Sequence, residues 1–314
     1  MEQARLASWL KQELGEELRA IRPVGGGCIH RAWQLELSDG RRLFAKTNHA
    51  SLLPVLGAEA EGLTALRQAA VPHPDGQPLT VPAPLRLAEL AGEALLLLSW
   101  LDLEKHPAGS GADQGWHELG AGLAALHRAS LRGHDGCFGW QHDNFIGSGT
   151  QANGWHAAWG PFFSQQRLGA QLRWAARSGR RLAGAEELLE QVPNWLRHHP
   201  SEACLVHGDL WCGNAGLLQR CDHQRPGGGA VFDPAVYRGD REVDLAMAQL
   251  FGGFPEAFFA GYQSVWPLSP GHQQRVTLYN LYHLLNHANL FGGSYWGQAE
   301  RCIQGLLQAP PIWG

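Results

Sequence analysis

The stretch from Leu205 to Asn214 reads L-V-H-G-D-L-W-C-G-N, and the rest of the chain can be interpreted around it. Two apolar residues that can end a buried strand precede His207, Asp209 and Asn214. A carboxylate such as Asp209 can take the proton of a hydroxyl group, and it must stay ionised at neutral pH to do so. The amide oxygen of Asn214 can hold a hard divalent cation. The stretch therefore predicts an acid–base and metal-binding loop at the end of a strand.

The spacing H-x-D-x-x-x-x-N is that of the catalytic loop of protein kinases. A second strand-like run, Gly229 to Phe232, ends in Asp233, where kinases carry a further Mg²⁺ ligand, although D-P-A stands here in place of D-F-G. Together the two segments predict an ATP-dependent phosphotransferase with Asp209 as base and with Asn214 and Asp233 as Mg²⁺ ligands. The alternative interpretation is a polar loop between two helices.

The N-terminal region has the order expected of a hairpin that covers nucleotide phosphates. A short strand over 18–24 runs into glycines that let the backbone fold closely over a ligand. The next strand ends in Asp39-Gly40, a strong hairpin signal, and the return strand over 42–46 ends in Lys46. We expect Lys46 to hold the α- and β-phosphates. The predicted loop residues are Gly25, Gly26, Gly27 and Cys28.

A helix predicted over 58–69 supplies the acidic partner of Lys46. Glu59 and Glu61 both qualify, and Glu59 is preferred because it shares a face with Leu63 and Leu66, four and seven residues on. Glu61 is expected to lie on a solvated acidic face.

Two further strands, 84–87 and 94–98, would complete a five-stranded antiparallel sheet. Ser99, Trp100 and Leu101 would follow as the hinge, whose backbone can bond adenine. Helical patterns dominate the remainder of the chain. The fold class predicted is α+β, a protein-kinase-like bilobal fold with an N-lobe over 1–99 and a larger, mostly helical C-lobe over 100–314.

Composition limits the partners and the compartment. The 314-residue chain has a formal net charge of −4 and only 17% charged residues, so neither nucleic acid nor an anionic membrane is expected as a partner. Residues 1–14 are typical of an amphipathic helix without a signal-peptide core, and no apolar run approaches the ~20 residues that span a bilayer. Six scattered cysteines without a C-x-x-C pair favour reduced thiols in the cytoplasm.

Longer motifs are similar to those of the fructosamine kinase (ketosamine-3-kinase) family. They are H-G-D-L-W-x-G-N, F-D-P-A-V-Y-x-G-x-R-E-x-D-L-A-M, G-x-G-C-I, F-A-K-T-N, W-x-x-F-F-x-x-R-L and F-G-G-F-P-x-x-F-F-x-x-Y, in the same order over nearly the whole chain. The resemblance implies the fold of aminoglycoside phosphotransferases, the cofactors ATP and Mg²⁺, and phosphorylation of the sugar 3-hydroxyl of ketosamines, which destabilises the adduct and frees the amine. It also implies the roles above for Lys46, Glu59, Asp209, Asn214 and Asp233. Cys212 and His30 stand where many members carry Ser.

Three residues are candidates for contact with the acceptor. Trp211 faces either the sugar ring, on which an aromatic face can stack, or the core. Glu242 and Asp244 either bind the substrate amine or favour a helix N-terminus electrostatically. Cys28 is either a thiol whose oxidation blocks nucleotide binding or an inert small residue.

Several alternatives stay open at this point. A kinase for aminoglycosides, choline or homoserine would share the fold, and a nucleotide-binding scaffold without activity is a further possibility. The preferred sugar (fructosamine, ribulosamine or erythrulosamine), a free or protein-bound acceptor, and the oligomeric state are not determined by the sequence.

Overall fold

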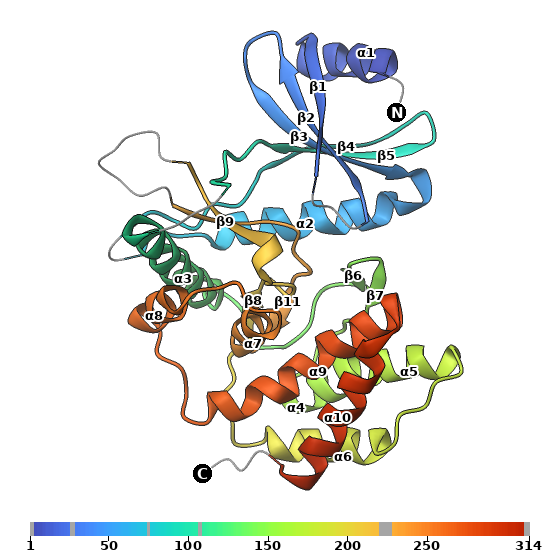
Figure 1. Cartoon of the computed structure of the whole chain (residues 1–314), viewed down its shortest axis with the longest axis vertical. Helices are drawn as coiled ribbons and strands as arrows, with labels where there is room; N and C mark the ends of the chain where they lie inside the picture. Colours follow the sequence, from blue (N-terminus) through green and yellow to red (C-terminus); the bar gives the residue numbers. More distant parts are fainter. Residues whose placement is uncertain (1–2, 26–28, 74–75, 106–108, 220–227, 311–314) are drawn as a thin grey trace.

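The computed structural model describes residues 3–25, 29–73, 76–105, 109–219 and 228–310. Its upper part in Figure 1, here called the N-lobe, is one antiparallel sheet in the order β1-β2-β3-β5-β4, with helix α1 on one side and helix α2 on the other. The bounds are α1 Gln3–Leu14, β1 Leu18–Val24, β2 Arg31–Leu37, β3 Arg42–His49, α2 Leu53–Ala69, β4 Pro84–Leu90 and β5 Glu93–Ser99. The five-stranded sheet that the sequence predicted is present.

The hairpin between β2 and β3 turns at Asp39-Gly40. Gly40 has φ +85°, a left-handed conformation that glycine adopts without steric cost. The register then pairs Ala32 with Lys46, so that Lys46 lies on a central strand beside the start of β2. Helix α2 begins at Leu53, earlier than the predicted start at Ala58, because Pro54 in the first turn is preorganised for a helix and has no N–H to satisfy.

The remainder, here called the C-lobe, is mainly helical and lies below α2 in Figure 1. Among its described residues are three short two-stranded pairs, β6-β7, β8-β11 and β9-β10. The helices are α3 Ser110–Ser130, α4 Trp159–Phe162, a π-helical segment Phe163–Leu168, α5 Gly169–Arg177, α6 Ala185–Trp195, α7 Glu242–Leu250, α8 Glu256–Val265, α9 His272–Phe291 and α10 Ser294–Gln308. The strands are β6 Asn144–Ile146, β7 Gly149–Gln151, β8 Cys204–Val206, β9 Ala215–Leu217, β10 Gly229–Val231 and β11 Tyr237–Gly239.

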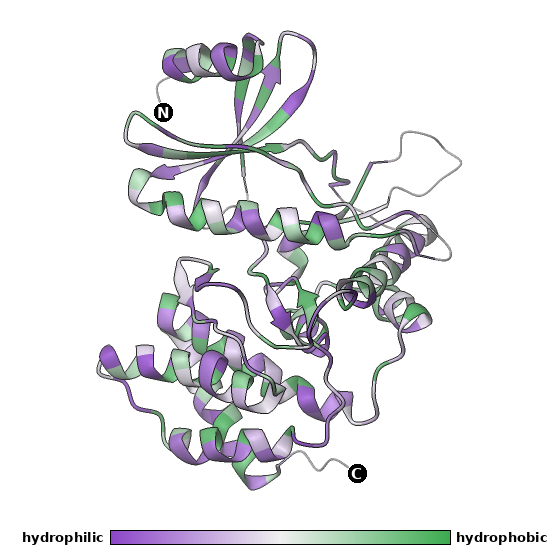
Figure 2. Ribbon diagram, turned by 180° about the vertical axis from the view of Figure 1, so that it is seen from behind, coloured by the Kyte–Doolittle hydropathy of each residue, from purple (hydrophilic) through white to green (hydrophobic). Residues whose placement is uncertain are grey.

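Three apolar clusters hold the fold together. One packs α1 on the outer face of the sheet, and another fills the lower C-lobe around α9. The middle cluster crosses the lobes, since Leu63 and Leu98 of the N-lobe share it with Leu123 and Val236 of the C-lobe. Figure 2 shows the corresponding pattern, with hydrophobic and hydrophilic residues alternating around the helices. The position of α2 is therefore set by apolar packing from both sides.

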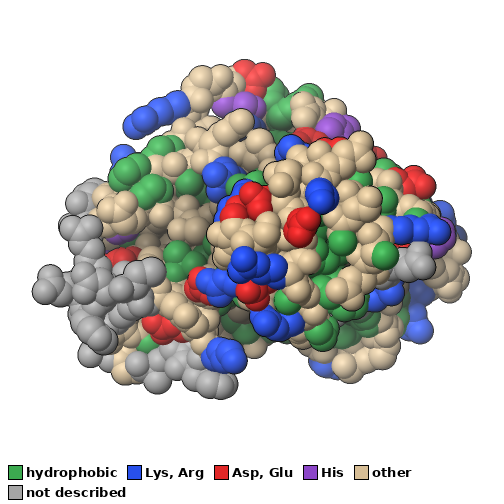
Figure 3. All heavy atoms as spheres, turned by 90° about the horizontal axis from the view of Figure 1, so that it is seen from above, with side chains coloured by type: hydrophobic (Ala, Val, Ile, Leu, Met, Phe, Trp, Pro, Cys, Tyr) green, Lys and Arg blue, Asp and Glu red, His purple; other side chains and the backbone are tan. Residues whose placement is uncertain are grey.

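The surface carries charges of both signs. On the face seen from above the N-lobe, Lys and Arg lie interspersed with Asp and Glu and with hydrophobic side chains (Figure 3). Among the described residues, no helix is both long and apolar enough to cross a membrane.

Candidate active site

A cavity of about 500 Å³ lies between the two lobes. It collects residues from the glycine-rich turn, the central strand, α2, the segment after β5 and the loops that follow β8 and β10. Gly26, Gly27 and Cys28 lie outside the described residues. The predicted residues that line the cavity are Gly25, Lys46, Glu59, Ser99, Trp100, Leu101, Asp209, Trp211, Asn214 and Asp233.

The loop after β8 takes its shape from a glycine and a histidine. Gly208 has φ +81°, and a Cβ there would lie 2.0 Å from the carbonyl oxygen of Ala235, so only glycine fits. His207 is fully buried, and its Nε2 donates to the carbonyl oxygen of Phe232 at 3.0 Å while its Nδ1 accepts from the N–H of Asp209 at 3.3 Å. This imidazole therefore fixes the Asp209 loop against the strand that leads to Asp233.

Asp209 and Asn214 turn toward one another. The side-chain nitrogen of Asn214 donates to the carbonyl oxygen of Asp209 at 2.9 Å and to its carboxylate at 3.2 Å. Since this nitrogen is engaged, the amide oxygen is the atom left to bind a ligand. Burial and then the negative charge of Asp233 raise the pKa of Asp209 to about 7. A carboxyl group poised near neutrality suits a general base.

Lys46 forms ion pairs with two carboxylates. Its Nζ lies 2.7 Å from Glu59 and 2.5 Å from Asp233. Burial favours the neutral amine, but the two carboxylates outweigh it and hold the pKa of Lys46 above its usual value. Asp233 has φ +58°, a left-handed conformation that non-glycine residues seldom adopt and that often marks a functional site.

The donor set fits a hard divalent cation. The cavity is lined by the carboxylates of Asp209 and Asp233 and by the side-chain amide of Asn214. The ammonium group of Lys46 is paired with both Asp233 and Glu59, so it balances only one of these two negative charges. The cluster therefore carries excess negative charge and offers the oxygen ligands that Mg²⁺ prefers.

Trp211 is half-buried and lines the cavity. A Cβ at Gly213 would stand 2.2 Å from its ring, so the indole packs directly against this glycine. The cavity is also lined by Phe145 and Gly147 of the β6-β7 hairpin and by His30. The sequence did not single out these residues as site residues, apart from the substitution at His30. The Gly- and aromatic-rich composition of 136–149 indicates a loop facing the cleft, but it does not identify these residues individually.

The structure does not bring Glu242 or Asp244 to the cavity, so the expectation that they bind the substrate amine is wrong in this geometry. Both carboxylate oxygens of the buried Asp244 accept backbone N–H groups, from His207 at 2.7 Å and Gly208 at 2.8 Å. Burial raises the pKa of Asp244, but the hydrogen bond and charge of His127 lower it further, and the net pKa lies below the usual value. Asp244 thus stabilises the backbone of the loop that carries Asp209, through its hydrogen bonds to His207 and Gly208.

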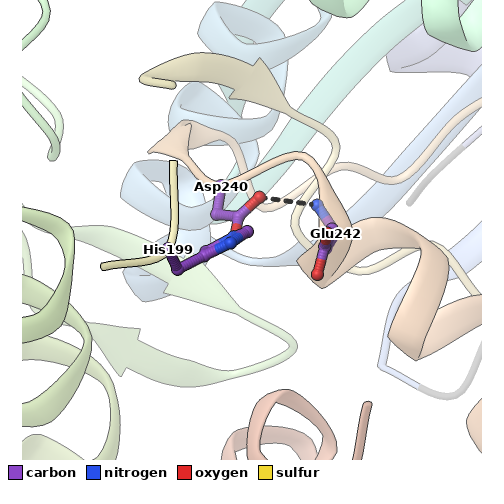
Figure 4. Close-up of side chains that lie close together, drawn as sticks. All are labelled: His199, Asp240 and Glu242. Atoms are coloured by element: carbon purple, nitrogen blue, oxygen red, sulfur yellow. Dashed lines mark hydrogen bonds and ion pairs between the residues drawn. The ribbon is translucent and has the colours of Figure 1, made fainter. Parts of the chain in front are cut away.

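Glu242 belongs to a separate buried cluster with His199 and Asp240, drawn in Figure 4. These three groups are of the metal-ligating kind, yet the carboxylates of Asp240 and Glu242 and the Nε2 atom of His199 are already paired. Arg275 donates twice to Glu242, at 2.6 and 2.8 Å, and Asp240 accepts from His199 at 2.5 Å and from the hydroxyl of Tyr279 at 2.6 Å. The guanidinium of Arg275 also opposes a cation here. We therefore assign the cluster a structural role, joining α7 to α9.

The two lobes enclose a cleft that holds a lysine–glutamate pair and the carboxylates of Asp209 and Asp233. This arrangement is typical of a phosphotransferase of the kinase-like fold. The family model described as fructosamine kinase matches residues 2–309. A relative from Synechocystis, named probable ketoamine kinase, is 40% identical over 96% of both chains. The crystal structure of a putative fructosamine-3-kinase from Haemophilus somnus superposes with a TM-score of 0.81 at 25% identity, covering 97% of both chains.

The chain belongs to the fructosamine kinase family. An aminoglycoside phosphotransferase solved as a ternary complex with ADP and hygromycin B has a TM-score of 0.63 at 14% identity over 98% of this chain and 99% of that one, which shows the shared fold alone.

Proposed function

We propose that this protein is an ATP-dependent kinase that phosphorylates the 3-hydroxyl of ketosamines, acting in deglycation in the cytoplasm. The observation that carries the proposal is the convergence of Lys46, Asp209, Asn214 and Asp233 on one interlobe cavity, in a chain of this family. The names of the relatives support a ketosamine acceptor, and the neighbour solved with ADP supports an adenine nucleotide.

Each cavity residue has a task in this mechanism. Lys46, oriented by Glu59, holds the α- and β-phosphates, and the segment Ser99 to Leu101 receives the adenine. Asn214 and Asp233 would hold Mg²⁺, which neutralises phosphate charge when bound. Asp209 accepts a hydrogen bond from the acceptor hydroxyl, orients it in line with the γ-phosphorus and takes its proton. Because the transition state is loose, positioning contributes more than proton abstraction.

The aromatic face of Trp211 supports a sugar as acceptor. It lies in the cavity wall close to Asp209 in sequence and in space, where a ketose ring can stack with one hydroxyl directed at the carboxylate. The protein would take fructosyl, ribulosyl or erythrulosyl groups on free or protein-bound amines.

Nucleotide consumption with a panel of acceptors tests the proposal. The panel contains fructosyl-, ribulosyl- and erythrulosyl-lysine beside kanamycin and choline, all with Mg²⁺ and ATP. We expect turnover of at least one ketosamine, with the phosphate found on the 3-hydroxyl. If no ketosamine is turned over while kanamycin or choline is, the proposed substrate class is wrong, and the conclusion about the fold is unaffected.

The matched variant for this panel is Asp209→Asn, which keeps the shape of the side chain and removes the base. We expect kcat to fall by about a thousandfold while the affinity for nucleotide is nearly unchanged. Turnover close to that of the wild type would refute the role of Asp209.

A further inference from the structure

Glu61 makes an interlobe contact that its sequence position does not predict. Its side chain is 30% accessible to solvent, and its carboxylate accepts hydrogen bonds from three consecutive side chains of the C-lobe. Trp140 Nε1 lies 2.9 Å and Gln141 Nε2 2.5 Å from Oε1, and His142 Nε2 lies 2.9 Å from Oε2. A carboxylate accepts only, so each of these nitrogens is the donor. We call Glu61 and these three residues the Glu61 latch.

The C-lobe side of the latch is firmly anchored. Gly139 exchanges two backbone hydrogen bonds with Arg238. The side chain of Asn144, which is 2% exposed, donates to the carbonyl oxygen of Val236 and accepts from Gln151. The residues that hold Glu61 are therefore anchored on the side of the C-lobe that faces α2, next to the segment that carries Asp233.

The N-lobe side of the latch is α2, the helix that carries Glu59. Glu61 and the buried Glu59 lie two residues apart, so a movement of one displaces the other. Beside them Gly62 faces the C-lobe, where a Cβ would meet Val236 at 3.1 Å and Pro234 at 3.3 Å. The polar contact of Glu61 thus adds to the apolar packing that holds α2 against the C-lobe, at the level of the Lys46–Glu59 pair. Figure 1 shows α2 running between the sheet and the C-lobe.

From these contacts we infer that Glu61 is a positioning residue for the phosphotransferase: the latch holds α2 so that Glu59 keeps Lys46 aligned for the nucleotide phosphates. The side chain of Glu61 touches neither Lys46 nor Asp209 and acts through Glu59. Because the latch is closed by side chains of the chain itself, the pair is assembled without a separate activating modification. The inference depends on the proposed function in one respect only, which is that the kinetic assay uses a ketosamine as the phosphate acceptor.

A double-mutant cycle between Glu61 and Glu59 tests the inference. Four proteins are compared: wild type, Glu61→Ala, Glu59→Gln and the double variant, with kcat/KM for ATP as the readout. We expect Glu61→Ala to lower kcat/KM by about tenfold in the wild-type background and by less than about twofold once Glu59 is already replaced. Equal losses in both backgrounds would mean that Glu61 does not act through Glu59 and would overturn the inference.

Three further variants separate positioning from folding. In Glu61→Gln the side-chain oxygen can still accept hydrogen bonds from Trp140 and Gln141. The side-chain nitrogen can donate to Nε2 of His142 when the proton of that imidazole is on Nδ1. This variant should therefore retain most of the activity. Trp140→Phe removes one donor with little change in packing, and it should show a smaller loss of the same kind. Glu89→Gln, at an exposed position on β4, is the matched surface control and should behave as wild type. If the fall in kcat/KM of Glu61→Ala is no larger than the fraction of that variant that is unfolded at the assay temperature, as measured by thermal melts, the inference is contradicted.

Direct binding keeps the inference independent of the acceptor. Calorimetric titration of the same four proteins with Mg²⁺ and a non-hydrolysable ATP analogue should show the same non-additive loss of affinity. If the wild type turns over no ketosamine, the proposed function fails, while the binding cycle still supports or refutes the Glu61 latch.

Discussion

The acidic residues of this protein differ in role because their neighbours differ. Asp209 is buried and lies near another carboxylate, Asp233, and these two effects outweigh the hydrogen bond from Asn214, so ionisation is disfavoured and the pKa of Asp209 rises to about 7. Asp244 receives two backbone N–H groups and His127, so ionisation is favoured and its pKa falls. The first is left poised to accept a proton, and the second is a permanent anion that holds the loop.

The raised pKa of Asp209 predicts the pH profile of the free enzyme. Asp209 can act as a base only when it is ionised. Because its pKa is raised, it becomes protonated, and activity is lost, at a higher pH than for an ordinary aspartate. Because burial is the main cause of the raised pKa and remains when the nucleotide is bound, we expect kcat/KM for the acceptor to decline as the pH falls below neutrality and to follow the ionised fraction of one group. The residual activity of Asp209→Asn should lack this acid limb. A wild-type profile that stays flat from pH 8 to pH 5.5 would contradict the assignment.

At the scale of elements, close helix contacts depend on glycine. In α3, a Cβ on Gly120 would lie 1.9 Å from the carbonyl oxygen of Phe258 in α8. In α8, a Cβ on Gly261 would lie 2.0 Å from the carbonyl oxygen of His117 in α3. The two helices therefore meet backbone to backbone, and α3 in turn supports the interlobe apolar cluster through Leu123.

This contact predicts opposite effects for the same substitution at two helical glycines. Gly120→Ala forces α3 and α8 apart and should lower the free energy of unfolding by about 3 kcal/mol. Gly305→Ala, in α10, meets nothing within 4 Å and should raise it by up to about 1 kcal/mol, because alanine has the higher helix propensity. Chemical denaturation of both variants checks the pair, and equal changes would argue against the packing described.

At the scale of the whole molecule, the cavity is assembled from both lobes. Lys46 comes from β3 and Asp233 from the segment after β10, 187 residues later, yet the two are in contact. The apolar cluster shared by the lobes holds these walls in place. A ligand that bridges the walls should therefore stabilise the molecule as a unit.

Nucleotide should raise the melting temperature only together with Mg²⁺. At a hundredfold excess over Kd, ligand binding adds about 3 kcal/mol to the stability of the folded state. We expect this shift in wild type and in Asp209→Asn, and we expect its loss with a chelator or in Asp233→Ala, which removes a proposed metal ligand. Thermal melts of the three proteins with and without the chelator make the comparison. An undiminished shift in Asp233→Ala would remove that residue from the metal site.

Local spacing explains why so much of the site could be predicted. His207, Asp209 and Asn214 lie on one short loop, and the helical period distinguishes Glu59 from Glu61 as the partner of Lys46. The same reasoning could not show that Glu61 meets Trp140, since nothing local links residues 79 positions apart. It also misassigned Glu242, because a carboxylate paired with an arginine 33 residues later looks the same in sequence as one open to a ligand.

The sequence by itself determined the order of the strands and helices, the glycine turns and the chemistry of the catalytic loop, because these depend on residue types at short spacing. The tertiary structure alone decided which acidic side chains remain available for chemistry. Asp209 and Asp233 are left at a cavity, whereas Glu61, Asp240, Glu242 and Asp244 are satisfied by distant donors. The physical reason is that the ionisation and availability of a carboxylate depend on burial and on the groups within a few ångströms, which are set only when the chain is folded.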